Sequence, residues 1–371
     1  MGKTLAEVAQ RLQEANKKAQ LIYAFNGTGK TRLSRAFKQL IAPKVDGGEA
    51  PSSALADKKM LYYSAFTEDL FYWDNDLGRD TEPKLKIQPN AFTKWVLEEQ
   101  GQDRSITTTF QRYTSDKLTP HFSEDFSSVS FSFERGNQQP EPHIKISKGE
   151  ESNFIWSVFN SLLEQVIAEL NIPEVADRST DVFNKLTHVF VDDPVSSLDE
   201  NHLIELAVNV AALIKSSESG LKFIITTHSP LFYNVLFNEL NGKGSYMLER
   251  YEDGSFELIE KPGDSNKSFS YHLHLLKTIE QAITDNKVER YHFTLLRNLY
   301  EKTAGFLGYL RWSELLPEDR QLYLNRIIQF TSHSTLSNET VAQPTPAESA
   351  MVKLLLDHLK KNHAFWQPQV A

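Results

Sequence analysis

A glycine-rich run that ends in lysine and threonine is the part of this sequence best suited to chemistry. It reads Ala24-Phe-Asn-Gly-Thr-Gly-Lys-Thr31, and it lies between an apolar run and the helical pattern RLSRAFKQLI. Glycines let backbone N–H groups close around phosphates, and a helix N-terminus adds positive potential. Strand, loop and helix in this order are the context of a P-loop, although a chance glycine turn is the alternative. The pattern predicts a nucleotide site formed by Asn26, Gly27, Thr28, Gly29, Lys30 and Thr31.

Two carboxylates follow an apolar run much later in the chain. Asp192 and Asp193 end the segment VFVDD, and His228 ends a second such segment about thirty residues further on. Asp192 is suited to hold Mg²⁺ together with Thr31, and Asp193 to orient or deprotonate an attacking water. The alternative for the two carboxylates is a strand that ends in a solvated turn. Asp199, in the polar segment between these two runs, is a further candidate nucleotide ligand.

A polar segment upstream of these carboxylates precedes a long amphipathic pattern over residues 150–170. It reads Ile146-Ser-Lys-Gly-Glu-Glu151. A helix that starts here would point its N-terminal N–H groups outward, where they can meet an anion. Ser147, Gly149 and Glu150 are therefore candidate nucleotide contacts.

A second chemical set lies near the C-terminus. Arg297 and Glu301 are four residues apart and so share one helix face, and His333 follows in FTSHST. The plain alternatives are a surface ion pair, worth about 0.3–0.5 kcal/mol, and a capping or core histidine. Together the three residue types suit metal-free cleavage of a phosphodiester that carries a neighbouring 2′-OH. A carboxylate or imidazole takes the 2′-OH proton, the other group protonates the departing 5′-oxygen, and arginine stabilises the phosphorane.

Composition excludes several classes of protein. The 371 residues contain no cysteine, which removes disulfide scaffolds, thiol nucleophiles and cysteine-based metal clusters. The formal charge is −9. Residues 263–371 hold 12 Lys and Arg against 11 Asp and Glu, a net charge of +1, so residues 1–262 hold 28 against 38, a net charge of −10. No signal peptide or apolar run of bilayer length is found, so we expect a soluble cytoplasmic protein without a membrane partner.

The elements that must position these residues change in character near Pro262. Before it, the apolar runs 20–25, 60–66, 188–191 and 221–226 alternate with helical patterns, which favours an α/β sheet. Asp253-Gly254 predicts a hairpin within residues 249–260. After it, helical periodicity predominates, with helices expected at 271–286, at 289–308, from Pro317 and from Thr345 to Lys361. We therefore expect two domains, 1–262 and 263–371.

The phosphate-binding motifs, in their order, resemble those of the ABC-type ATPases, especially the branch shared with recombination and chromosome-structure proteins. The resemblance implies a Walker A motif at 24–31, a signature at 146–150 and a Walker B motif that ends at 192–193. It also implies a D-loop at 197–199 and a switch histidine at His228. In that superfamily each nucleotide lies between two subunits, so a chain with one motif set implies at least a homodimer. The second carboxylate there is usually Glu, and the shorter Asp193 implies slow hydrolysis or a gating role.

The whole chain resembles the PrrC family of bacterial anticodon nucleases. The resemblance rests on long strings, including QLIYAFNGTGKTRLSR, FTEDLFYWDND, ISKGEESNFIWSVF, VFVDDPVSSLDENHLIELAVN and RYHFTLLRNLYEK with FTSHSTLSNE. It implies an α/β ABC-type P-loop ATPase domain followed by an all-α HEPN-like nuclease domain. It also implies cleavage of tRNA-Lys 5′ to the wobble base, which leaves a 2′,3′-cyclic phosphate and a 5′-OH. The catalytic residues it implies are Arg297, Glu301 and His333, without a decision on which of the last two is the base.

The same resemblance supplies expectations about ligands and partners. It implies that Asp264, Ser265, Asn266 and Lys267 read the anticodon, a segment that would otherwise pass as a linker. It implies ATP or GTP with Mg²⁺, a thymidine nucleotide such as dTTP as a regulatory ligand, and phage defence beside a type I restriction–modification complex. Two rival functions remain, an ATPase that remodels DNA or protein complexes without cleaving RNA, and a module that binds tRNA without cutting it.

Overall fold

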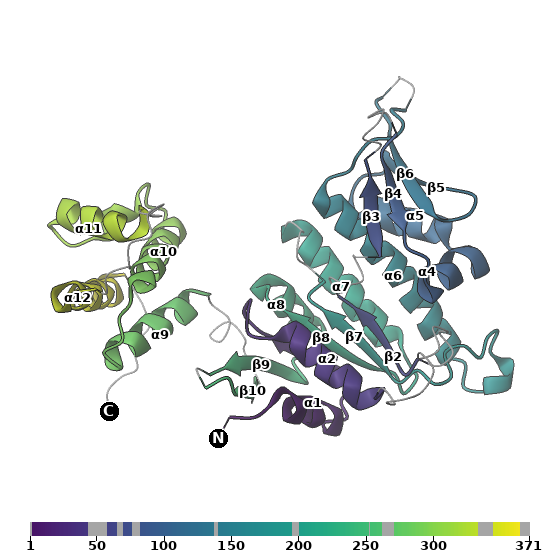
Figure 1. Ribbon diagram of the computed structural model, residues 1–371, viewed down its shortest axis with the longest axis horizontal. Helices are drawn as coiled ribbons and strands as arrows, with labels where there is room; N and C mark the ends of the chain where they lie inside the picture. The colour runs from purple at the N-terminus through teal and green to yellow at the C-terminus, as the bar shows by residue number, and fades with distance from the viewer. Residues whose placement is uncertain are drawn as a thin grey trace. The chain divides into compact units, whose positions relative to one another are not determined.

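The computed structural model describes residues 2–43, 58–64, 70–75, 82–136, 140–194, 200–251, 253–261, 271–332 and 344–363. The chain divides into two compact units, Met1–Ser265 and Asn266–Ala371, and each is described by itself. Figure 1 shows strands only in the first unit, while the drawn elements of the second are helices. The described part of the chain therefore has an α/β unit followed by a helical one.

The first unit is built on a six-stranded sheet in the order β10-β9-β1-β8-β7-β2. All neighbouring strands are parallel except β10, which forms an antiparallel hairpin with β9, as the Asp253-Gly254 turn predicts. Apolar side chains fill the central strands, as is typical of a parallel sheet covered on both faces. The strands are β1 (Ala19–Tyr23), β2 (Met60–Tyr63), β7 (His188–Asp192), β8 (Lys222–Thr227), β9 (Ser245–Arg250) and β10 (Phe256–Glu260).

Alternate residues of β1 contact different helices because successive side chains of a strand point to opposite faces. Ile22 joins the core formed with α1 (Leu5–Glu14) and α2 (Lys30–Ile41), which Figure 1 shows together beside the sheet. Tyr23 meets the ring of Tyr233 on α8 (Pro230–Glu239), with ring centroids 5.9 Å apart. Helix α7 (Glu200–Ser216) packs on α8. The strand that leads into the glycine-rich loop is therefore fixed from both sides.

Residues 68–120, for which the sequence gives no clear pattern, supply most of a second sheet. Its order is β3-β4-β6-β5, and all pairs are antiparallel. The long helix α6 (Lys148–Leu170) packs here, and its Phe154 meets the rings of Phe71, Phe110 and Phe131. The other elements are β3 (Phe71–Asp74), β4 (Lys84–Ile87), α4 (Ala91–Lys94), a π-helical turn (Trp95–Glu99), α5 (Asp103–Tyr113), β5 (Leu118–Phe122), β6 (Ser128–Phe133) and a 3-10 turn (Val175–Asp177).

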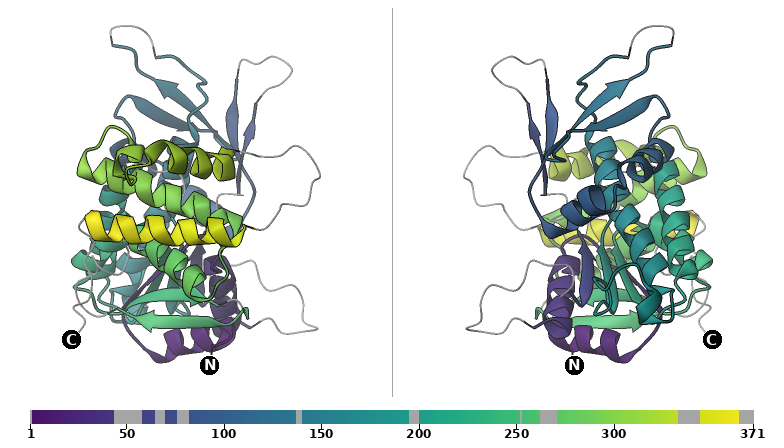
Figure 2. Two further views of the ribbon diagram at one scale, coloured as in Figure 1. Left: turned by 90° about the vertical axis from the view of Figure 1, so that its left-hand side faces the viewer. Right: turned by 90° about the vertical axis from the view of Figure 1, so that its right-hand side faces the viewer.

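The second unit packs its helices around a core of leucine and aromatic side chains. Figure 2 shows these helices packed against one another, and Phe293, Leu296 and Tyr300 of α10 lie in the core with Leu355 and Leu359 of α12. The helices are α9 (Tyr271–Thr284), α10 (Arg290–Leu307), α11 (Arg320–Ser332), α12 (Pro346–Asn362) and the 3-10 turn Trp312–Leu315. The helix expected from Pro317 begins at Arg320, three residues later.

Candidate functional site

Three of the predicted motifs meet at one edge of the six-stranded sheet. The glycine-rich loop follows β1, the two carboxylates follow β7, and His228 follows β8, which lies between β1 and β7. These strands are parallel, so their carboxyl ends lie at the same edge. Ligands of open α/β sheets bind at this edge, outside the carboxyl ends of the strands.

The glycine-rich loop has the backbone conformation that its glycines permit. Gly27 and Gly29 have φ of 80° and 117°, in the region that L side chains rarely adopt. A side chain at Gly27 would meet no atom within 4 Å, so its backbone faces open space. Gly29 is the N-cap of α2 and makes no side-chain cap bond. The backbone N–H groups of the first turn of α2 are therefore not capped by this residue and can donate to a ligand. The loop is thus open toward the space a phosphate needs.

Lys30 is held inside this loop by three oxygen atoms. Its amino group donates to the Ala24 carbonyl at 3.2 Å and to Asn26 Oδ1 at 3.1 Å. It also forms an ion pair with Asp193 Oδ2 at 3.3 Å. The side chain is 8% exposed, so the charge lies at the base of the loop with its direction fixed.

Asp193 joins Lys30 to His228. Its carboxylate lies 2.7 and 2.8 Å from His228 Nδ1 and accepts the His228 backbone N–H at 3.2 Å. Burial acts to raise the pKa of Asp193, but the His228 hydrogen bonds and the Lys30 charge outweigh it and lower the pKa overall. Asp193 has φ of 55°, and its N–H is held by the Thr226 carbonyl at 3.0 Å. The geometry keeps this carboxylate ionised and aimed between Lys30 and His228.

Asp192 is held by partners that the sequence did not reveal. Its carboxylate accepts the Thr226 hydroxyl at 2.6 Å and the Tyr62 hydroxyl at 3.4 Å. Tyr62 in turn meets Ser34 at 2.7 Å, which links β2 to α2. Burial raises the pKa of Asp192, and hydrogen bonds from Thr226 and Thr31 oppose this change. Tyr62 and Thr226 carry no motif signal, and only the sheet order brings them to Asp192.

The residues at this edge fit a magnesium nucleotide. Thr31 and Asp192 interact directly, and Mg²⁺ in nucleotide sites usually takes one or two protein oxygens besides phosphate oxygens. Among the residues that the structure describes, no group of three or more His, Asp or Glu side chains forms a metal site by itself. A cation bound here would therefore depend on phosphate oxygens for most of its ligands.

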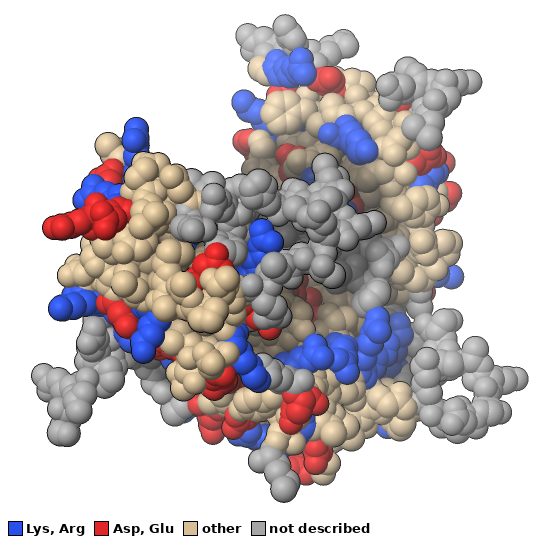
Figure 3. All heavy atoms as spheres, turned by 60° about the vertical axis from the view of Figure 1, so that its left-hand side comes forward, with Lys and Arg blue, Asp and Glu red and all other residues tan. Residues whose placement is uncertain are grey.

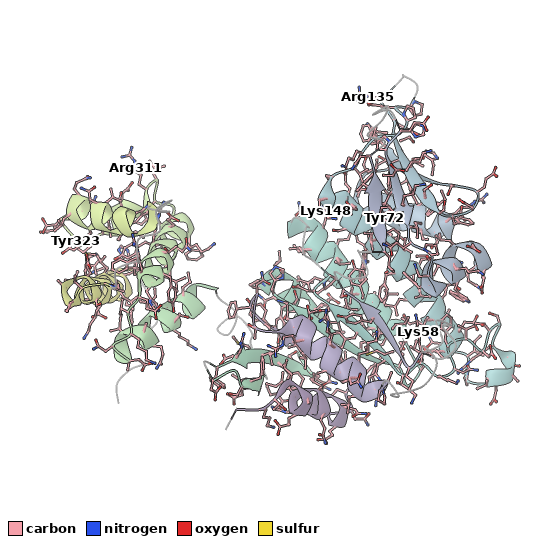
Figure 4. All side chains as sticks on the ribbon, in the orientation of Figure 1. Lys58, Tyr72, Arg135, Lys148, Arg311 and Tyr323 are labelled. Atoms are coloured by element: carbon pink, nitrogen blue, oxygen red, sulfur yellow. The ribbon has the colours of Figure 1, made fainter. Side chains whose placement is uncertain are left out.

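The predicted signature segment forms the start of α6. Ser147 is the N-cap residue, and it forms a capping box in which Glu150 donates its N–H to Ser147 Oγ at 3.3 Å and accepts the Ser147 N–H at 2.7 Å. Beside it, the nearly buried Glu151 binds Lys148 at 2.6 Å and the Trp73 indole at 2.9 Å. Figure 4 labels Lys148 and, on β3, Tyr72 near this helix end. Glu150 therefore has a structural role in addition to the predicted nucleotide contact.

In the second unit, Arg297 and Glu301 form the pair that the sequence predicts. Arg297 donates from Nε to Glu301 Oε1 at 2.7 Å, and its guanidinium lies 6.0 Å from the centre of the Trp312 ring. Both side chains of the pair are about a third exposed, at 36% and 37%. The opposite face of α10 is buried, so the helix presents this pair at its surface.

Comparison with known proteins places the chain in a family. It is 68% identical over 392 aligned positions to a protein of Escherichia coli described as "Anticodon nuclease", an alignment that covers 100% of this chain and 99% of that protein. The chain belongs to the anticodon nuclease family. Membership makes it an endoribonuclease. No family model matches the sequence.

Solved structures similar to this chain include SMC head domains. The SMC head domain from Thermotoga maritima is 11% identical with a TM-score of 0.32, over 66% of this chain and 91% of that one. An Smc head bound to the C-winged helix domain of ScpA is 10% identical with a TM-score of 0.31, over 61% and 60%. These scores are too low to support an argument, so the α/β assignment of the first unit rests on its own strands and helices.

Several predicted site residues of this family member lie outside the described residues. They are His333 of the catalytic set, Asp199 of the nucleotide set, and the four RNA-reading residues Asp264, Ser265, Asn266 and Lys267. Their roles stay predictions.

The surface of this anticodon nuclease bears charges of both signs. On the face drawn in Figure 3, basic and acidic side chains are interspersed, and one group of Lys and Arg side chains gathers toward the lower right. Among the described residues, no helix is long and apolar enough to cross a bilayer.

Proposed function

We propose that this chain is a nucleotide-regulated tRNA anticodon nuclease. Residues 1–262 act as an ABC-type ATPase domain and residues 263–371 as a HEPN-like nuclease domain. The observation that carries the proposal is the Lys30–Asp193–His228 arrangement at the sheet edge, in a chain that also holds the Arg297–Glu301 pair on a separate helical unit. The first arrangement suits a phosphate ligand and the second suits RNA cleavage.

The nucleotide step follows from the contacts of Lys30. Phosphate oxygens of ATP or GTP that enter the loop replace Asp193 as the partner of Lys30, because both are anions and Lys30 has one charge to share. Asp193 then keeps His228 and is free to orient a water molecule toward the γ-phosphate. Thr31 and Asp192 would hold Mg²⁺, which would supply positive charge to the phosphate groups. Nucleotide binding thus replaces the ion pair between Lys30 and Asp193 with a contact between Lys30 and phosphate.

The cleavage step is transesterification within the RNA. The 2′-oxygen attacks phosphorus and the bond from phosphorus to the 5′-oxygen breaks, which gives a 2′,3′-cyclic phosphate and a 5′-OH. One of Glu301 and His333 accepts the 2′-OH proton, and the other donates a proton to the leaving oxygen. Arg297, oriented by Glu301 through its Nε, offers its remaining N–H groups to the charged phosphorane. This chemistry uses no metal ion.

The substrate and the biological setting are proposed on the family resemblance. The substrate is the anticodon loop of tRNA-Lys, cut 5′ to the wobble base and read by residues 264–267. The chain acts in the cytoplasm in phage defence, beside a type I restriction–modification complex, with dTTP as a regulatory ligand. Ser147, Gly149 and Glu150 of a second copy complete the nucleotide site, with Asp199 at the interface, so the active form is at least a homodimer.

Incubation of purified protein with total tRNA and Mg-nucleotide tests the proposal. We expect one nick in the anticodon loop of tRNA-Lys, with a 2′,3′-cyclic phosphate and a 5′-OH found by end-mapping. Arg297→Ala and Glu301→Ala should each lower the cleavage rate by about 10²-fold or more, since each removes a group that acts in the transition state. Lys353→Ala, an exposed change in the same unit, is the matched control.

Two results would contradict parts of the proposal. If wild-type protein supplied with nucleotide never nicks tRNA but still hydrolyses nucleotide, the remodelling ATPase becomes the better description. If cleavage survives in Arg297→Ala, Glu301→Ala and His333→Ala, the nuclease stands and its catalytic residues lie elsewhere.

A further inference from the structure

A hollow with a basic rim lies at the end of the six-stranded sheet opposite the nucleotide site. Its volume is about 790 Å³, within the range of pockets that bind small molecules. It is lined where β1 and β9 begin and where α7 and α8 end. The P-loop and both carboxylates follow the carboxyl ends of the parallel strands, so this hollow is separate from the nucleotide site.

Lysine side chains converge on this hollow from four separate parts of the chain. Lys17 and Lys18 precede β1, Lys215 lies in the last turn of α7, Lys243 follows α8, and Lys261 follows β10. Two glutamates also line the hollow, so the net charge of its lining is +3. Residues 1–262 as a whole carry −10, so the sign of this lining is opposite to that of its surroundings.

The ion pairs at the rim use only part of this charge. Lys17 pairs with Glu260 at 2.9 Å, and Lys215 pairs with Glu239 at 2.6 Å. Lys243 and Lys261 form no ion pair with any described residue, and Lys243 is exposed. The pairs account for two of the five lysines, and Lys18 donates to the Lys215 carbonyl at 3.4 Å. Lys243 and Lys261 remain free for a ligand.

The floor of the hollow is mostly apolar. Phe237 and Ile214 are nearly buried. Gly244 has φ of 78°, and a side chain there would lie 2.5 Å from the Ala19 carbonyl oxygen. The loop that carries Lys243 is therefore pressed onto the start of β1, which limits the positions its lysine can reach. An apolar floor below two unpaired cations suits a ligand that combines phosphate with a flat or apolar body.

We propose that this hollow, with Lys243 and Lys261 as its contacts, binds a phosphate-bearing ligand other than the nucleotide of the P-loop. Two sources share this chemistry, a free nucleoside triphosphate and the backbone of the tRNA substrate. Lysines bind both as point charges, so affinity should fall with salt. The proposal does not depend on which residues cleave RNA.

Binding measurements on full-length variants test this site. In the free-nucleotide arm, a Lys30→Ala background removes the main P-loop contact, and residual binding of labelled ATP is measured by anisotropy. In the RNA arm the probe is a labelled tRNA with 2′-deoxyribose throughout its anticodon loop, which has no 2′-OH to attack. The test variant is Lys243→Glu with Lys261→Glu. The control is Lys94→Glu with Lys117→Glu, two exposed lysines of the same unit with the same change in charge.

We expect the test variant to lose at least tenfold in affinity in one arm, while the control stays within twofold of wild type. A loss for ATP alone identifies a free nucleotide as the ligand, and a loss for tRNA alone identifies the RNA backbone. Equal thermal midpoints for the two variants exclude unfolding as the cause of a loss. If the test variant and the control match in both arms, the site does not exist. Normal tRNA cleavage alongside that result would leave the proposed nuclease function intact.

Discussion

At the candidate nucleotide site, one carboxylate contacts two charged or titratable side chains. Asp193 binds the Lys30 amino group and the His228 imidazole at once, and its pKa is lowered overall despite burial. In the proposed mechanism, a carboxylate in this position competes with phosphate for Lys30 and also orients the water molecule that attacks the γ-phosphate. When the charge of Asp193 is removed, we therefore expect the rate of nucleotide hydrolysis to fall while the affinity for nucleotide does not.

Asp193→Asn tests this expectation. The amide keeps the size of the side chain but carries no charge, so it neither competes for Lys30 nor activates water. We expect nucleotide hydrolysis to fall by about 10²-fold, the typical contribution of a general base, while Mg-nucleotide binds at least as tightly as to wild type. Steady-state hydrolysis and titration with labelled nucleotide measure the two effects. Asp116→Asn, on the surface of the same unit, is the control, and hydrolysis at the wild-type rate in Asp193→Asn would refute the role.

At the level of elements, the start of α6 combines a structural and a predicted functional role. Ser147 caps the helix with its hydroxyl, and the same residue belongs to the predicted signature that meets the γ-phosphate of a second copy. The two roles respond differently to charge, because a helix N-terminus accepts a carboxylate while a phosphate repels it.

A pair of substitutions at Ser147 separates these roles. Ser147→Ala removes the cap and should lower the free energy of unfolding by about 1 kcal/mol. Ser147→Asp keeps a good cap, so its stability should match wild type, while its negative charge should reduce nucleotide hydrolysis at least tenfold. Chemical denaturation and hydrolysis assays give the two readouts. Wild-type hydrolysis in a stable Ser147→Asp protein would show that the segment is a cap only.

His188, the first residue of β7, makes the free energy of unfolding depend on pH. Burial lowers the pKa of His188 to about 4, and the charge of Lys222 adds to this. In the unfolded chain a histidine has a pKa of about 6.5, so as pH falls the unfolded state binds the proton first. The contribution of His188 is therefore present above about pH 6.5 and is lost as pH falls toward 4.

His188→Asn should remove this dependence. The side chain of Asn does not titrate, and it can still meet the Thr187 hydroxyl, which lies 2.8 Å from His188 Nδ1. From pH 7.5 to pH 5 the wild type should lose about 2 kcal/mol more of its free energy of unfolding than the variant. Urea titrations at the two pH values provide the comparison. His121→Asn, on the exposed edge of the second sheet, is the control, and equal losses in wild type and His188→Asn would exclude the assignment.

On the scale of the whole molecule, the presence of one P-loop and one predicted signature per chain predicts that nucleotide binding drives dimerisation. The P-loop follows β1 and the predicted signature starts α6. The resemblance to ABC-type ATPases implies that each nucleotide lies between the P-loop of one copy and the signature of another, so we expect a second copy to complete each site. A nucleotide that contacts both copies binds the dimer better than the monomer, and this difference in affinity is what shifts the population.

Crosslinking measures this shift directly because the chain has no native cysteine. In a variant with Thr28→Cys and Lys148→Cys, mild oxidation should give a disulfide-linked dimer in the presence of Mg-nucleotide and little without it. Each single variant is a control, since one cysteine alone cannot join a P-loop to a signature. Equal yields with and without nucleotide would contradict assembly driven by nucleotide.

The sequence predicted those helices and strands that have a clear local pattern of apolar and polar residues. The apolar runs at 188–191 and 221–226 became β7 and β8 with ends shifted by one residue, and Asp253-Gly254 marked the β9–β10 hairpin. The strands β3 and β4 were missed because each has only four residues. In β3 aromatic side chains adjoin a charged one without alternation, and the alternation of Lys and apolar residues in β4 is too short to mark a strand by itself. Strand β3 pairs with β4, and β6, the other partner of β4, lies about forty residues further on, beyond the reach of any local pattern.

The sequence by itself determined which residues are candidates for the chemistry, because glycine conformational freedom, lysine charge and carboxylate spacing are properties of the residues themselves. It identified the glycine-rich loop, the two carboxylates, His228 and the Arg297–Glu301 spacing. Only the tertiary structure decided that β8 lies between β1 and β7, and hence that Asp193 touches both Lys30 and His228, while Tyr62 supports Asp192. These contacts join residues more than thirty to over a hundred and sixty positions apart, and the order of strands in a sheet is set by the packing of the whole chain rather than by local preference.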